Sequence, residues 1–402
     1  MANKKRKMAS GLGRAPANPG KAPTIPGVAP TLAKATPAAA PTIVKPATPR
    51  VEDVRKMGSK LFVENYPVYA GDFDSVRDRV RGTVMWSVYG DSAGMPFEGQ
   101  APFQIYKRNG GWVTGLAKPD NNFARYLGRG GWTDDTQLKL AILQSYIDCD
   151  GQLDMEDMAY HHVRMLDAGP RGWGGSTRDS TLRLKKGVSW RKSGQPDGAG
   201  NGIPMKVSIV GLKYGMMCRD EILDGTFKYG PLATEVRNIA IMTHRDTRAV
   251  IAGIIHAVLV AWAINDVDPL ENWDRLMKMI LRLEEHFGKE ADTLSERFDH
   301  IPGNLHRGAE YFAHLYRTGC FVVESYPFSV ATYLIHRKNV VAGILDAVNA
   351  GGDCDSTAAM VGDLCGAEAG LGIEDRTLAL EEHDNLLGTI DAFYDTVRAS
   401  RI

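Results

Sequence analysis

Apolar residues recur at three- and four-residue spacing along most of the chain after residue 72, and few stretches alternate with the two-residue period of a strand. We expect helices at 73–89, 136–148, 233–242, 249–264, 269–287, 305–317 and 340–348. Glycine-rich stretches between them predict loops at 90–99, 109–115, 169–175, 194–202 and 351–352. This pattern predicts an all-α fold with its functional residues in the loops around one central site.

The most apolar segment, 249–264, is too short to cross a membrane. It holds 16 residues, includes His256 and is flanked by Arg248 and Asp266, whereas a transmembrane helix needs about 20 consecutive apolar residues. We therefore expect a buried helix here and no membrane partner for the chain.

Composition and charge divide the chain into two parts. The 402 residues are 44% hydrophobic and 24% charged, as in ordinary globular proteins. Residues 1–50, however, hold nine of the 20 prolines and nine Lys or Arg, with no acidic or aromatic residue, which leaves the remainder at a net charge of −9. We expect a disordered, basic, Pro/Ala-rich extension at 1–70, followed by one domain at 71–402.

The basic run at residues 4–7 is not followed by an apolar stretch, so it does not predict a secretory signal. A nuclear-import or nucleic-acid role stays open for this run, although the composition favours a solvated tail. The five cysteines are odd in number, scattered and without Cys-x-x-Cys spacing. They favour free thiols in a reducing cytoplasm.

The candidate chemistry lies in two acidic clusters, Gly-Trp-Thr-Asp-Asp-Thr at 131–136 and Gly-Gly-Asp-Cys-Asp-Ser-Thr at 351–357. Each places two carboxylates and a hydroxyl beside glycine and leads into an apolar, helix-like segment. Oxygen ligands on short side chains suit Mg²⁺, Mn²⁺ or Ca²⁺, whereas Zn²⁺ calls for Cys and His. Four neighbouring carboxylates repel one another unless cations compensate them, so the clusters predict a two-metal site if the fold brings them together.

A simpler explanation exists for either cluster alone. Acidic residues in the first turn of a helix complement its dipole, and Thr133 would be an ordinary N-cap. The second cluster has the same composition, which favours the metal site. Asp353 and Asp355 would also point the same way if their segment is extended.

Five motifs in chain order resemble the ADP-ribosylglycohydrolase family, which includes the dinitrogenase reductase-activating glycohydrolase. They are Gly-Thr-Val-Met-Trp-Ser-Val-Tyr-Gly-Asp-Ser-Ala-Gly-Met-Pro-Phe-Glu at 82–98, Trp-Thr-Asp-Asp-Thr at 132–136, Gly-Asn-Gly-Ile-Pro-Met-Lys at 200–206, Thr-His-Arg-Asp at 243–246 and Gly-Asp-Cys-Asp-Ser-Thr at 352–357. The resemblance covers residues 75–372, and the two acidic motifs are its specific part.

The resemblance implies an orthogonal all-α bundle with a central dinuclear site for two Mg²⁺ or Mn²⁺ ions. It also implies a hydrolase of the N- or O-glycosidic bond between ADP-ribose and an acceptor. By matching position, the metal ligands would be Thr133, Asp134, Asp135, Asp353, Asp355 and Ser356. Glu98 would approach the metals from the first motif and act with Asp135 and Asp355 in catalysis. Two such ions can bind ribose hydroxyls and lower the pKa of water, and a nearby carboxylate can move a proton.

Further residues resemble the family's substrate site. The loop with Gly200, Asn201 and Gly202 is similar to a pyrophosphate loop, although a flexible surface loop is the alternative. His244 resembles a phosphate-contacting histidine, with a structural role as the alternative. Trp173 is a candidate for stacking on ribose or adenine, with core packing favoured for any single Trp.

Three positions depart from the family pattern without removing a carboxylate. Cys354 lies between two ligands, Ser356 keeps the hydroxyl of a Thr, and Lys206 replaces an Arg after Met205, which exchanges a planar fork for a point charge. We therefore expect an active enzyme.

The expected activity is removal of ADP-ribose from modified protein side chains. Arginine is the favoured acceptor, and serine-linked ADP-ribose is the close alternative. A different alternative is an immunity-type protein whose extension binds and blocks an ADP-ribosylating toxin. The expected partner is an ADP-ribosylated protein; nucleic acid is not favoured.

Overall fold

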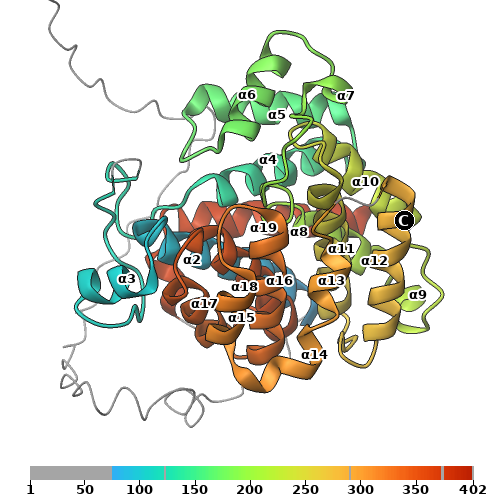
Figure 1. The fold of residues 1–402 in the computed structure, drawn as a ribbon. Coiled ribbons are helices and arrows are strands. Elements are labelled where there is room, and N and C mark those ends of the chain that lie inside the picture. Colours follow the sequence, from blue (N-terminus) through green and yellow to red (C-terminus); the bar gives the residue numbers. More distant parts are fainter. Residues whose placement is uncertain (1–74, 122–123, 289–290, 373–374, 401–402) are drawn as a thin grey trace, which may run out of the picture. The chain divides into compact units, whose positions relative to one another are not determined.

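The computed structural model describes residues 75–121, 124–288, 291–372 and 375–400. The expected extension at 1–70 and its boundary with the domain lie outside these residues. Within the described ranges the regular elements are helices, and extended backbone pairs only in two isolated bridges, Gln195 with His244 and Gly200 with Phe321 (Figure 1). The all-α prediction is confirmed.

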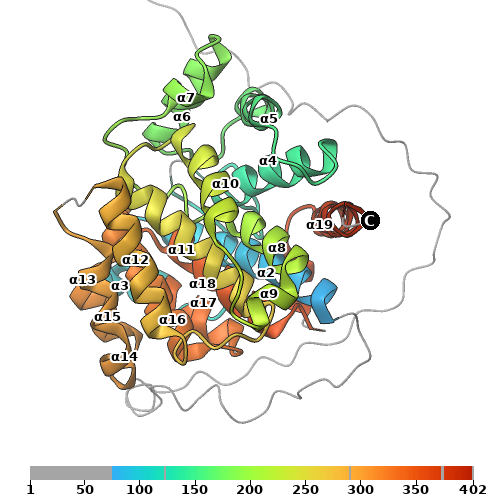
Figure 2. The ribbon, with the colours of Figure 1, turned by 90° about the vertical axis from the view of Figure 1, so that its right-hand side faces the viewer.

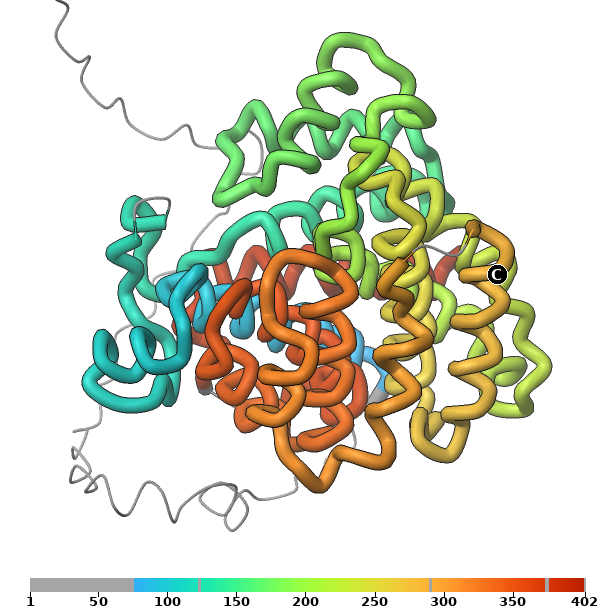
Figure 3. Tube along the Cα trace, in the orientation of Figure 1, coloured from blue at the N-terminus to red at the C-terminus, as the bar shows by residue number. Residues whose placement is uncertain are grey.

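The helices run in chain order as follows: α2 (Ser75–Gly94), η1 (Met95–Phe97), α3 (Pro102–Asn109), α4 (Asp134–Asp148), α5 (Met155–Ala168), α6 (Gly175–Lys185), α7 (Trp190–Ser193), α8 (Ser208–Met217), α9 (Arg219–Leu223), α10 (Gly230–Ile241), α11 (Thr247–Ala263), α12 (Trp273–Phe287), α13 (Leu294–Phe298), α14 (Ile301–Asn304), η2 (Leu305–Arg307), α15 (Ala309–Tyr316), α16 (Val322–His336), α17 (Val340–Asn349), α18 (Cys354–Ala369), η3 (Asp375–Ala379) and α19 (His383–Ala399). In Figures 1 and 3, α5–α7 lie on the outer side of α4, away from α2 and α18.

Helices α2 and α18 are neighbours in Figures 1 and 2, and the contacts of their glycines show that they pack antiparallel with their backbones touching. A Cβ atom on Gly90 would lie 2.3 Å from the Ala358 carbonyl oxygen, and one on Gly362 would lie 2.3 Å from the Trp86 carbonyl oxygen. Glycines four residues apart on each helix leave a flat stripe, because positions i and i+4 share one helix face. Only residues without a side chain permit this approach.

The expected loop at 90–99 is therefore wrong. Helix α2 continues to Gly94, where a Cβ atom would lie 2.4 Å from the Asp355 backbone nitrogen, and η1 follows directly. Gly90 and Gly94 therefore permit close helix packing and do not form a turn.

The other expected helices match observed ones, with one division. Segment 305–317 forms η2 and α15, separated at Gly308, whose φ of 82° interrupts a helix. The periodicity did not reveal α5, α6, α8, α16 or α19, and it indicated α18 only as an apolar, helix-like segment after the second acidic cluster. Every residue of α18 from Cys354 to Glu368 is buried, and α16 contains Pro327, so neither helix shows a simple amphipathic pattern.

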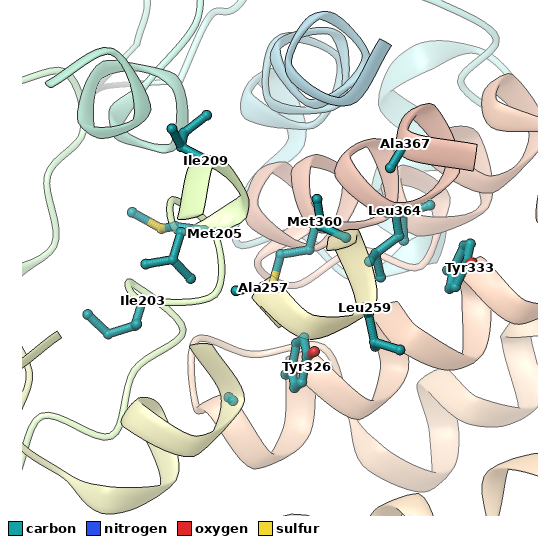
Figure 4. Close-up of a cluster of buried hydrophobic side chains, with 14 of the residues drawn as sticks. Ile203, Met205, Ile209, Ala257, Leu259, Tyr326, Tyr333, Met360, Leu364 and Ala367 are labelled. Atoms are coloured by element: carbon teal, nitrogen blue, oxygen red, sulfur yellow. The ribbon is translucent and has the colours of Figure 1, made fainter. Parts of the chain in front are cut away.

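The apolar segment 249–264 forms α11, whose side chains from Ala249 to Ala263 are all buried. Figure 4 shows part of this core, where side chains of α11, α16 and α18 meet those that precede and begin α8. In the described part of the chain, no helix is long and apolar enough to span a membrane.

A buried polar cluster joins four helices at the centre. The Lys139 ammonium of α4 donates to Asp363 of α18 at 2.8 Å and to Ser87 of α2, and His256 of α11 lies 3.2 Å from the same Asp363 oxygen. All four side chains are buried. Removing one partner of such a buried pair leaves an uncompensated charge, so the cluster holds α4 in register with α18.

The packing of α2 on α18 generates the first prediction. Gly90→Ala should destabilise the protein by about 1–3 kcal/mol, because the added methyl group meets backbone that cannot rotate away. The matched control is Gly388→Ala in α19, where an added Cβ meets nothing within 4 Å; this variant should be neutral or up to about 1 kcal/mol more stable. Urea unfolding of both variants would measure this, and equal stabilities would contradict it.

Candidate metal centre

Asp91 of α2 organises the start of α4. Its carboxylate accepts hydrogen bonds from the Thr133 hydroxyl at 2.8 Å, the Thr136 hydroxyl at 2.6 Å and the Thr133 backbone N–H at 2.9 Å. Thr133 therefore does not act as the ordinary side-chain N-cap considered above. Its hydroxyl hydrogen points to Asp91, which leaves the oxygen lone pairs able to face a cation.

A pair of glycines positions the second cluster. Gly351 and Gly352 both have φ of 71°, a conformation that other residues avoid. Gly352 accepts from the Gly99 N–H at 2.7 Å, which places the neighbouring Glu98 beside this cluster. Asp353 then precedes α18, and Asp355 lies in its first turn, so the segment is not extended and the condition stated for the two carboxylates does not apply.

The two acidic clusters meet although 221 residues separate them. The Ser356 hydroxyl lies 3.2 Å from Asp135 Oδ2 and donates to it. Carboxylate oxygens of Asp91, Asp135 and Asp355 lie within 4.8 Å of one another, and so do those of Glu98, Asp353 and Asp355. Asp355 belongs to both groups, so the geometry offers two adjacent subsites.

The residues present fit a hard cation. Asp135 Oδ1 is buried and has no hydrogen-bond partner among the described residues, although a buried carboxylate oxygen normally has one. The donor set around it consists of carboxylate and hydroxyl oxygens, which Mg²⁺ and Mn²⁺ prefer over Cys or His.

The electrostatics point the same way. Burial, and then the charges of neighbouring carboxylates, raises the pKa values of Asp134, Asp135 and Asp355 well above their usual range. Burial and the Asp353 charge raise the pKa of Glu98 to about 7. Burial lowers the pKa of the nearby Lys206 ammonium to about 7, against the attraction of Asp134. The ionised carboxylates therefore need positive charge beyond that which the side chains supply.

The glycine-rich loop contains Asn201, and the ring of His244 packs against the inside of the loop. The Asn201 amide donates to Asp353 Oδ2 at 2.6 Å, and its backbone N–H donates to the Cys320 carbonyl at 2.9 Å. The His244 ring fills the inside of the loop, since a Cβ atom on Gly202 would lie 2.7 Å from its Cε1. Its Nδ1 lies 3.0 Å from the Thr243 hydroxyl, and burial lowers its pKa to about 3. The imidazole is thus neutral and supports the loop.

Trp173 is buried and donates from Nε1 to the Gln137 side chain of α4 at 2.6 Å. This arrangement corresponds to the packing role considered for it above.

Sequence reasoning overlooked one residue of this site and one contact between two residues that it had named. Asp91 is present in the first motif, in the Gly-Asp pair at 90–91, but nothing marked it as the acceptor for Thr133. The bond from Asn201 to Asp353 links a loop to a cluster 152 residues away, and a single sequence carries no signal for such a contact.

The raised pKa of Glu98 generates the second prediction, for chelator-treated protein. A carboxyl whose folded pKa exceeds its unfolded value stabilises the fold at low pH, and this contribution is lost as pH rises through about 7. Glu98→Gln keeps the shape without ionising, so its melting temperature should match the wild type at pH 4, below the ordinary glutamate pKa, and exceed it by a few degrees at pH 8.

Subtracting the two melting curves cancels the contributions of the buried histidines, which both proteins share. A difference that is constant between pH 4 and pH 8 would show that Glu98 does not ionise against burial and Asp353.

Comparisons with known proteins identify the family of this chain. The sequence profile of the ADP-ribosylglycohydrolase family matches residues 72–401. An uncharacterized protein of Archaeoglobus fulgidus is 26% identical over 304 residues, covering 75% of this chain and 91% of its own. An uncharacterized protein of Escherichia coli, YegU, is 25% identical over 321 residues, covering 76% and 91%.

Two further similarities extend this comparison. An ADP-ribosylarginine hydrolase of Pseudomonas putida is 25% identical over 260 residues, covering 61% of this chain and 60% of its own. A solved structure of an ADP-ribosylglycohydrolase-related protein complex shares the fold with a TM-score of 0.62 and 22% identity, over 81% of this chain and all of that one. The chain belongs to the ADP-ribosylglycohydrolase family and is a hydrolase of glycosidic bonds to ADP-ribose.

Proposed function

We propose that this protein removes ADP-ribose from arginine side chains of modified proteins, with two Mg²⁺ or Mn²⁺ ions. The observation that carries the proposal is the meeting of Asp135 and Ser356, on two helices far apart in sequence, in a buried group of carboxylates. The family supplies the reaction class.

The ions would be held by Thr133, Asp134, Asp135, Asp353, Asp355 and Ser356. When bound, they supply positive charge that orients ribose hydroxyls and makes water easier to deprotonate. Asp91 acts on the first cluster by fixing the Thr133 hydroxyl, and Asn201 acts on the second by fixing Asp353. Such supporting hydrogen bonds commonly matter for metal affinity.

Glu98 is the proposed proton carrier. It comes from the end of η1 rather than from either cluster, and its carboxylate lies beside Asp353 and Asp355. In hydrolysis, water forms a bond to the anomeric carbon, the bond from that carbon to the guanidine nitrogen breaks, and the proton lost by water reaches the departing nitrogen. A carboxylate beside the reacting atoms can carry that proton.

The loop at 198–202 is the proposed pyrophosphate site. The N–H groups of Gly200 and Gly202 are its candidate donors, and His244 holds the loop in shape from inside. Trp173 would support the site indirectly, because its hydrogen bond to Gln137 packs it against α4.

The arginine acceptor is supported by the Pseudomonas putida relative, which is an ADP-ribosylarginine hydrolase. Serine is the alternative acceptor, and the experiment described next distinguishes it from arginine. The immunity-type alternative depends on residues 1–70, outside the described part of the chain, and stays a prediction.

The proposal predicts release of ADP-ribose from arginine-modified protein with Mg²⁺ or Mn²⁺, little release from serine-modified protein, and none with EDTA. Asp355→Ala and Asp134→Ala should each lower the rate by about 100-fold or more, because the loss of one carboxylate removes negative charge that balances and holds the cations. Asp384→Ala, at an exposed position of α19, is the control and should retain the rate. Normal turnover by folded Asp355→Ala would refute the metal-ligand assignment. Faster release from serine-modified protein would show that serine, not arginine, is the acceptor.

Glu98→Gln separates chemistry from binding. It should retain ADP-ribose affinity and metal content while the rate falls by about 100-fold or more, because proton transfer typically contributes that much. Calorimetry with ADP-ribose and metal analysis would be compared with single-turnover rates. Loss of metal together with ADP-ribose affinity would make Glu98 a metal ligand instead.

A further inference from the structure

Phe103 and Tyr126 are the two most exposed large apolar side chains of the described residues, at 73% and 63% exposure. A single exposed aromatic residue is ordinary on a protein surface and needs no explanation. These two, however, belong to segments that are both hydrogen-bonded to η1, at whose end Glu98 lies. The two exposed rings therefore have one location in common.

Phe103 lies beside the second acidic cluster. It is the second residue of α3, and the residues just before it pair with the glycines of that cluster. The Gly352 N–H donates to the Gln100 carbonyl at 2.9 Å, and a Cβ atom on Gly351 would lie 3.2 Å from the Pro102 nitrogen. The backbone that carries Phe103 is thus fixed next to the chain that leads into α18.

Tyr126 lies beside the first acidic cluster, on the turn that precedes it. In this turn Leu127 packs with Met95 of η1, and a Cβ atom on Gly131 would lie 2.9 Å from the Leu127 Cβ. Burial raises the pKa of the Tyr126 hydroxyl, and the Asp134 charge acts in the same direction, so this cluster is within electrostatic reach of the phenol. One exposed ring therefore lies beside each acidic cluster.

The chain around the two rings is basic. Residues 99–130 include five Lys or Arg and one acidic residue, Asp120, which is paired with Arg108. The other four cations are exposed and form no ion pair within the described ranges: Lys107, Lys118, Arg125 and Arg129. Aromatic rings and unpaired cations together fit a protein surface that is acidic and carries apolar side chains.

We propose that Phe103, Tyr126 and the four exposed cations form a docking rim for a protein substrate whose surface is acidic beside the modified arginine. The inference rests on the proposed function and names the class of protein on which that site acts. A protein whose ADP-ribosyl group reaches the metal centre covers both rings, because one ring lies beside each acidic cluster. Burial of the rings on contact then stabilises the complex.

Three probes separate docking from chemistry. They are ADP-ribosyl-arginine and two peptides of equal length and leucine content, each with one central ADP-ribosylated arginine among either acidic or neutral residues. The wild type should have a kcat/KM for the acidic peptide about tenfold above that for the neutral one. Added salt and Arg125→Gln should each lower this ratio, because exposed charge pairs are screened by salt and lost with the cation.

The rings are tested by substitution. Phe103→Ser and Tyr126→Ser should each lower kcat/KM for the acidic peptide about tenfold, through KM, as expected for aromatic residues that an interface buries. Turnover of ADP-ribosyl-arginine, which is too small to cover the rings, should change less than about twofold. The matched control is Leu281→Ser at a 51% exposed position of α12, which should turn over all three probes like the wild type.

Binding is also measured without turnover, by fluorescence anisotropy of the labelled peptides in the Glu98→Gln background. If no probe releases ADP-ribose, the proposed function fails, and the anisotropy still decides on the docking rim. Equal affinities for the acidic and neutral peptides, or unchanged affinities in folded Phe103→Ser and Tyr126→Ser, would overturn the proposal. A concentration-dependent dimer of the wild type that both substitutions abolish would also overturn it, because a second copy of the chain would then occupy this surface.

Discussion

The close contact between α2 and α18 is the constraint on which the rest of the structure depends. Glycines at four-residue spacing let the two backbones touch along their length, and this contact ends where Gly94 meets Asp355. Asp91 lies on the last turn of α2 and Asp355 on the first turn of α18. The contact that sets the distance between the helices therefore also sets the distance between two of the site's carboxylates.

Helix α4 is attached to this pair at two points one turn apart. Asp91 holds its first turn through Thr133 and Thr136, and Lys139 reaches Asp363 of α18 from the next turn. Both attachments are buried hydrogen-bonded charges, which demand good geometry because an unpaired buried charge is expensive. They account for the placement of Asp135 opposite Ser356, which no contact within α4 could determine.

The sequence predicted features that depend on local order and missed those that depend on contacts. The acidic clusters that open helices were predictable, since carboxylates beside glycine before an apolar run have a local meaning. Gly90 and Gly94 were misread as a loop because glycine favours both turns and close helix packing, and only the partner helix decides between them. The buried helix α18 offered no amphipathic period, and the role of Asp91 required knowledge of Thr133 in space.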